Sequence, residues 1–157
     1  MLKNRFIIAT LTAGLFLTGC GASESEEAHV EHANGDLREE TVSPEVLPGF
    51  MDEKPENVQN IYLAAAQHRD LLESIPCYCG CGDHAGHKDN YDCFVHENRD
   101  DGRITWDDHG TKCGVCLEIA ASSINDYQQG KSIKKIRADI DKAYENGYAE
   151  PTPTPAL

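Results

Sequence analysis

Apolar residues spaced alternately by three and four positions predict a first helix that starts near Pro55. Asp52 is a candidate N-cap for it. Pro76 ends it, because proline lacks a backbone donor and restricts the residue before it. The positions of this stripe are Val58, Ile61, Ala65, His68, Leu72 and Ile75.

Two further stripes predict a pair of helices in the second half of the chain. The earlier one is closed by Gly130, and the later one follows Ser132 as N-cap and ends at Gly147. Because only a short turn separates them, we expect an antiparallel pair. The stripe positions are Cys113, Cys116, Leu117, Ala120, Ile124 and Tyr127 in one helix, and Ile133, Ile136, Ile140 and Ala143 in the other.

Residues 77–112, between the first two predicted helices, show little periodicity and are rich in Gly, Asp, His and Cys. An irregular segment of this length inside a compact domain is unusual, and it indicates another source of order or a functional role. The expected fold is therefore mainly α. It is a small three-helix domain over residues 51–148, with a Cys/His-rich irregular segment between helices one and two.

Both ends of the mature chain are expected to lie outside this domain. Residues 20–50 carry many charges and few large apolar side chains, which is typical of a flexible acidic tether. Residues 149–157 contain Pro151, Pro153 and Pro155, which disfavour helix and central strand and predict an extended tail.

Residues 1–19 have the pattern of a lipoprotein signal peptide. Lys3 and Arg5 precede an apolar run from Phe6 to Leu17 that is too short for an ordinary membrane span. The run ends in Leu-Thr-Gly-Cys, which resembles a bacterial lipobox, whose cysteine carries lipid. We therefore expect lipidation of Cys20 and a lipid-anchored location at the extracytoplasmic face of the cell membrane.

The net charge of the chain limits the classes of molecule that it is expected to bind. The chain has a formal net charge of −13, and loss of Lys3 and Arg5 with the signal peptide makes it more negative still. Such a surface repels nucleic acid, so a nucleic-acid partner is not expected. The expected partners are the membrane through its lipid anchor, a metal ion and an envelope protein.

Six cysteines follow Cys20, all in the irregular segment or at the start of the second helix. Three of them lie within five residues. This spacing is too short for unstrained disulfides among them, and it is better suited to a turn that presents sulfur ligands to a metal. A second pair lies at a helix N-terminus, where free N–H groups favour thiolate. A Cys₄ set for zinc or Cu(I) would combine Cys79, Cys81, Cys113 and Cys116, with Cys77 and Cys93 as extra ligands or one disulfide.

Alternatives to metal binding remain open at this point. An exported small domain with an even number of cysteines is normally a disulfide framework, and the Cys113–Cys116 spacing also occurs in thiol redox proteins. Imidazole could complete a soft-metal site through His84, His87 or His109, although histidines in loops are usually solvated.

The hexapeptide from Pro76 to Cys81 reads Pro-Cys-Tyr-Cys-Gly-Cys. Together with the lipobox and the later Cys-x-x-Cys, it resembles the bacterial PCYCGC-motif lipoproteins over about Phe50 to Tyr148. The resemblance implies a lipoprotein with these domain limits, and it implies no activity.

The chain shows no catalytic set. Residues 97–108 are faintly similar to a calcium loop, but Arg99 stands where a ligand is needed, so a turn at Gly102 is the better interpretation, with Trp106 packed over it. We expect a non-enzymatic protein that binds copper or zinc through its cysteines. A disulfide-stapled envelope scaffold is the second hypothesis, and a thiol–disulfide redox partner is the third.

Overall fold

The computed structural model describes residues 30–157. The expected signal peptide, Cys20 and the first part of the expected tether lie outside the described residues. In residues 30–157, no helix combines the length and the apolar character that crossing a bilayer requires.

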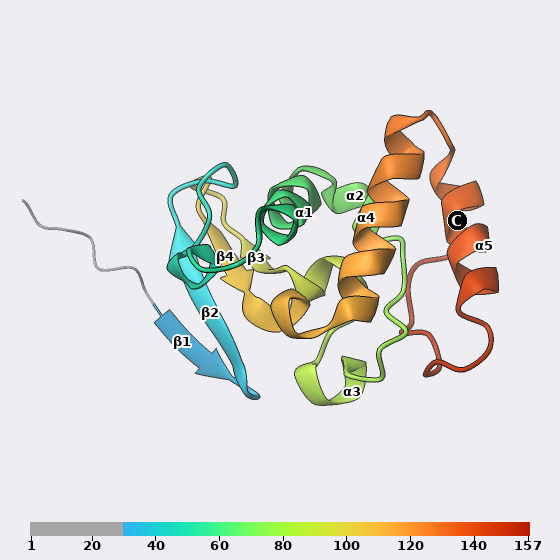
Figure 1. Cartoon of the computed structure of the whole chain (residues 1–157), viewed down its shortest axis with the longest axis horizontal. Coiled ribbons are helices and arrows are strands. Elements are labelled where there is room, and N and C mark those ends of the chain that lie inside the picture. The colour runs from blue at the N-terminus through green and yellow to red at the C-terminus, as the bar shows by residue number, and fades with distance from the viewer. Residues whose placement is uncertain (1–29) are drawn as a thin grey trace, which may run out of the picture.

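A four-stranded antiparallel sheet forms one end of the described chain (Figure 1). Its strand order is β1-β2-β4-β3. Asn34 and Gly35, with φ of 53° and 89°, form the tight turn between β1 and β2, as a two-residue hairpin requires. The strands are β1 Val30–Ala33, β2 Asp36–Thr41, β3 Val95–Asn98 and β4 Ile104–Asp107.

Four of the five α-helices in the described chain follow the predicted stripes, and the short α3 lies in the segment that was expected to be irregular. The first stripe is divided between two helices, because the backbone leaves helical geometry at His68 (φ −120°, ψ 42°). Ser132 caps the last helix, as predicted, by accepting a hydrogen bond from the Lys135 N–H. The helices are α1 Glu56–Gln67, α2 Arg69–Leu72, α3 Gly82–Ala85, α4 Gly114–Gln128 and α5 Ile133–Ala143.

The core lies between the sheet and the helices, and α4 packs against α1, α2 and α5 (Figure 1). Tyr62 of α1 meets Phe94 edge to face, with ring centroids 5.0 Å apart, and the fully buried Trp106 of β4 completes this aromatic cluster. The Tyr62 hydroxyl donates to the Asp107 carbonyl at 3.0 Å and accepts from the Thr111 N–H at 3.1 Å. It thereby ties α1 to the turn that follows β4.

The expectation of a mainly α three-helix domain is wrong, because the sheet was missed. Two of its strands come from residues 30–41, which were expected to belong to a flexible tether, and two come from the segment expected to be irregular. Strand β2 has mainly polar side chains, and ion pairs and hydrogen bonds hold it in the sheet where an apolar face would otherwise do so. Arg38 pairs with the buried Asp107 at 3.0 Å, and the Trp106 indole donates to Thr41 at 2.8 Å.

Candidate metal centre

The C-terminal segment holds the first cysteines in place. After Pro76 the chain runs beside residues 149–152. The Cys77 N–H donates to Thr152 Oγ1 at 2.9 Å, and the Thr152 N–H donates to the Cys77 carbonyl at 3.1 Å. The Ala149 N–H donates to the Tyr78 carbonyl at 3.2 Å. Cys77 and Tyr78 are buried as a result.

A turn at Gly80 shapes the rest of the hexapeptide. Gly80 has a φ of 76°, which reverses the chain so that the Cys81 N–H points back at Cys79 Sγ, 3.3 Å away. Backbone N–H donation to sulfur stabilises thiolate, the form that binds metal. This turn directs Cys79 toward the protein interior.

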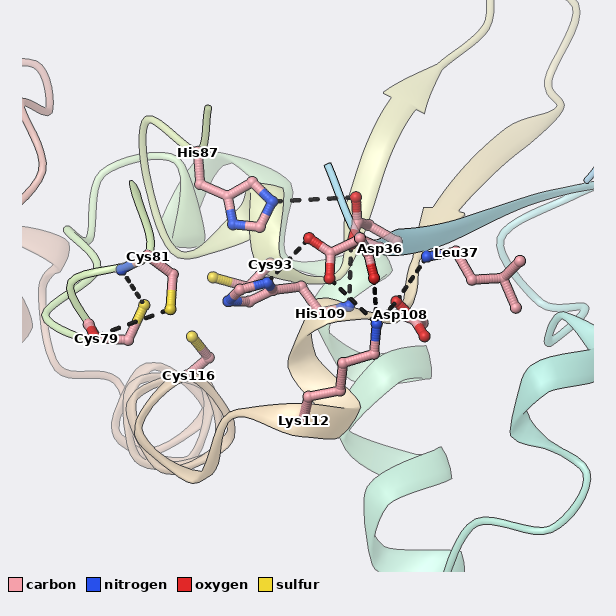
Figure 2. Close-up of polar contacts among 12 residues, drawn as sticks. Asp36, Leu37, Cys79, Cys81, His87, Cys93, Asp108, His109, Lys112 and Cys116 are labelled. Atoms are coloured by element: carbon pink, nitrogen blue, oxygen red, sulfur yellow. Dashed lines mark hydrogen bonds and ion pairs between the residues drawn. The ribbon is translucent and has the colours of Figure 1, made fainter. Parts of the chain in front are cut away.

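The other side of the centre comes from the 3₁₀ turn Asp108–Lys112 and the start of α4. His109 lies in the turn, Cys113 is the N-cap of α4, and Cys116 follows one turn later with no exposed surface. Figure 2 shows Cys116 pointing from α4 toward His109 and Cys79.

Two groups of ligand atoms result, each with all its atoms within 4.8 Å of one another. The first, which we call the Cys₃His centre, contains Cys79, His109, Cys113 and Cys116. The second, the three-sulfur group, contains Cys77, Cys93 and Cys116. Cys116 belongs to both.

The sulfurs of the three-sulfur group are fully enclosed. Cys77 Sγ lies 3.6 Å from Cys116 Sγ and 3.8 Å from Cys93 Sγ. All three residues are at most 1% exposed. Cys77 Sγ also lies only 3.0 Å from Cys79 Sγ, so the two groups are in direct contact.

Protons are shared unevenly among these groups. Hydrogen bonds from the Cys113 and Cys116 thiols lower the pKa of Cys79 to about 4. The sulfurs of Cys113 and Cys79, ahead of the Asp36 carboxylate, raise the pKa of His109 to about 11. These two shifts favour an imidazolium beside a thiolate at neutral pH, and both groups could serve as metal ligands once the imidazole proton leaves.

His109 is oriented by a residue that the sequence analysis missed. Its Nδ1 donates to Asp36 Oδ2 at 3.1 Å, which leaves Nε2 buried, without a hydrogen-bond partner (Figure 2). Although burial raises it, the pKa of Asp36 is lowered by hydrogen bonds from His109 and Lys112. Asp36 therefore stays ionised and fixes the imidazole, as carboxylates behind metal-bound histidines do.

His87 lies behind this arrangement. Its ring packs edge to face on His109, with centroids 4.6 Å apart, and neither ring nitrogen has a hydrogen-bond partner. Burial, and then the positive charge of His109, lower the pKa of His87, so it stays neutral. His87 falls in two further ligand groups, one with Cys93 and His109 and one with Asp36 and Asp107.

Two expected ligands fall in no ligand group. Cys81 Sγ faces the Cys79 carbonyl at 3.9 Å, and His84 is exposed. In the sequence-based Cys₄ set, His109 therefore takes the position assigned to Cys81. All six cysteines of the described chain are free thiols, and five of their sulfurs converge at one place, whereas a disulfide framework would distribute them as separate pairs.

Comparisons with known proteins agree with the hexapeptide. A family model described as "Protein of unknown function with PCYCGC motif" matches residues 8–157, which confirms the resemblance found in the sequence. No curated protein and no solved structure gives a significant match to the chain.

Proposed function

The chain therefore belongs to the PCYCGC-motif family, and because the family description assigns no function, we propose from the site itself that the protein binds a soft transition metal, copper or zinc, at its Cys₃His centre. One observation carries the proposal. Three sulfurs and an imidazole from two distant segments converge within 4.8 Å, with the His109 Nε2 buried and unpartnered. Nε2 lies near the sulfurs of Cys79 and Cys113 without an aligned hydrogen bond to them, and a metal ion bound among these atoms would give it a partner.

The chemistry of the donors selects the metal class. Thiolate and imidazole prefer Zn²⁺ and Cu(I) over Mg²⁺ or Ca²⁺, which take oxygen ligands. Three sulfurs and one nitrogen fill a tetrahedral coordination sphere and leave no open position, as in structural zinc sites rather than catalytic ones. We therefore propose a binding protein and not an enzyme.

Elemental analysis combined with thiol counting tests the proposal on the full-length protein, purified without oxygen. We expect bound copper or zinc, with the thiols of the Cys₃His centre protected from alkylation until the metal is removed. The variants Cys113→Ser and His109→Asn should lose metal. The matched controls Cys81→Ser and His96→Asn should keep it, since Cys81 falls in no ligand group and His96 is an exposed residue of β3. Full oxidation to disulfides with no metal retained would instead support the scaffold hypothesis.

We further propose that the protein works at the extracytoplasmic face of the cell membrane, anchored through lipid on Cys20. Residues 1–20 support this proposal by their basic start, short apolar run and lipobox-like end. A metal-binding protein in that position would hand ions to, or receive them from, an envelope protein. Labelled fatty acid should enter the wild-type protein and not Cys20→Ala, and labelling of the variant would contradict the anchor.

A further inference from the structure

We infer that the protein binds two metal ions, as a Cu(I) pair bridged by the Cys116 thiolate. One ion occupies the Cys₃His centre and the other the three-sulfur group. The inference rests on the proposed function and adds to it a second metal position and a metal oxidation state.

The distances in the three-sulfur group are those of a metal's coordination sphere. With metal–sulfur bonds of about 2.3 Å, sulfurs around one trigonal or tetrahedral ion lie about 3.8–4.0 Å apart. Cys77 Sγ lies 3.8 Å from Cys93 Sγ and 3.6 Å from Cys116 Sγ. An ion can therefore enter this group with small movements of the side chains.

The crowding of sulfurs is the second argument for an ion at this position. Cys77 Sγ lies 3.0 Å from Cys79 Sγ, 3.6 Å from Cys116 Sγ and 3.8 Å from Cys93 Sγ, in a buried place. No His of the described chain falls in a ligand group with Cys77. Several sulfurs gathered around one point, without an imidazole among them, suit a soft metal cation.

Coordination number points to Cu(I). The three-sulfur group offers three ligand atoms, all from residues that are at most 1% exposed. No His, Asp or Glu of the described chain joins the group as a fourth ligand. Structural zinc is almost always four-coordinate, whereas Cu(I) is stable with a few soft sulfur ligands.

Sharing of Cys116 makes the two ions one unit. A thiolate has more than one lone pair, so Cys116 Sγ bonds to both ions without further ligands. Each thiol that becomes a ligand releases its proton to solvent, and no electron moves because copper enters as Cu(I).

Anaerobic titration of the full-length protein with Cu(I), against a chromophoric Cu(I) chelator, tests the inference. The wild type should bind two equivalents of Cu(I) that the chelator does not remove. Cys93→Ser, which disables the three-sulfur group, should keep one equivalent, and Cys113→Ser, which disables the Cys₃His centre, should also keep one. Cys116→Ser should keep fewer than either, and the control Cys81→Ser should still keep two.

The outcomes separate this inference from the proposed function. A wild type that holds a single ion, lost in Cys113→Ser and kept in Cys93→Ser, would leave the proposed function standing and overturn the pair. Three or more tightly held equivalents would overturn it as well. No retained metal of any kind would overturn both.

A measurement on the wild type alone covers the case in which a buried Cys→Ser variant fails to fold. X-ray absorption at the copper edge of the protein loaded with two equivalents should show sulfur neighbours at about 2.3 Å and a copper neighbour at short range. Absence of the copper neighbour would overturn the bridge.

Discussion

Asp36 supports the proposed metal centre through its contact with His109. Its carboxylate accepts from His109 Nδ1 at 3.1 Å and pairs with Lys112 at 3.2 Å. Loss of such an outer partner typically costs about 10–100-fold in metal affinity, because the imidazole loses both its orientation and part of its basicity. We predict a loss in this range for Asp36→Asn, measured by competition with a chelator.

The exposed Asp100 provides the control. Asp100→Asn removes the same charge from the chain without touching the centre and should leave the affinity unchanged. If Asp36→Asn behaved like Asp100→Asn, the orienting role of Asp36 would be wrong.

Asp89 predicts a pH dependence of stability. It is 8% exposed, and burial together with the Asp92 charge raises its pKa from 3.8 to about 7. The folded protein thus holds a proton that the unfolded chain releases. The free energy of unfolding therefore falls as pH rises from about 4 to about 7 and is constant above that range as far as this group is concerned.

Asp89→Asn removes this charge and keeps the oxygen that accepts from the Asp92 N–H. The variant should be more stable than the wild type by about 4 kcal/mol at pH 8 and about equally stable near pH 4. Urea unfolding of both proteins in the same metal state measures the difference. An equal difference at both pH values would show that Asp89 is ionised throughout in the folded protein.

At the level of elements, helices were predictable and strands were not. The stripe from Cys113 to Tyr127 marked α4 because its buried face repeats at helical spacing. Strand β2 gave no such signal, since it reads Asp-Leu-Arg-Glu-Glu-Thr and is held by ion pairs with distant residues. Strand β4 did alternate, with Ile104 and Trp106 buried, but it was interpreted as part of a loop.

The hairpin also had a local signal that was overlooked. Asn34-Gly35 is a strong short-range indicator of a two-residue β-turn, yet the charged surroundings favoured a tether. For the site, spacing pointed to the five cysteines of the two ligand groups and to His109, but it also pointed to Cys81 and His84, which fall in no ligand group. Asp36 could not be found, because only the pairing of β2 with β4 brings it to His109, 73 residues away.

The C-terminal segment, residues 149–157, packs along the start of the cysteine hexapeptide. It has no helix or strand, but it hydrogen-bonds the backbone of Cys77 and Tyr78, and Arg137 of α5 donates to its Thr154. Deletion of residues 149–157 removes the hydrogen-bond partners of Cys77 and Tyr78 and exposes these two residues to solvent. We predict that this variant folds but releases metal to a chelator about tenfold faster.

A smaller deletion tests whether the contacts matter. Removal of residues 156–157, both exposed, leaves the hydrogen bonds of Thr152 and Thr154 in place and should not change the release rate. Stopped-flow measurement of transfer to the chelator compares the three proteins. Equal rates for all of them would mean that the segment does not limit metal release.

On the scale of the whole molecule, the centre lies where sheet and helices meet (Figure 1). Residues 77–93 supply one side, the turn before α4 and its first residues supply the other, and β2 supports His109 from behind. No one of these segments builds the centre alone. Metal binding and folding are therefore expected to be coupled, so that removing the metal lowers the stability of the entire described unit.

The coupling predicts that residues 30–50 are required for the centre. Without β2, the buried Asp107 loses the Arg38 guanidinium, the Trp106 indole loses Thr41, and His109 loses Asp36. Breaking a buried ion pair by removing one partner costs about 3–5 kcal/mol, a large part of the stability of a small domain.

A chain that begins at Met51 should therefore neither unfold cooperatively nor retain metal, whereas a chain that begins at Val30 should do both. Circular dichroism during urea unfolding and elemental analysis of the two chains check this. Retention of metal by the shorter chain would show that the helices and cysteines alone suffice, and that the sheet only supports an already formed centre.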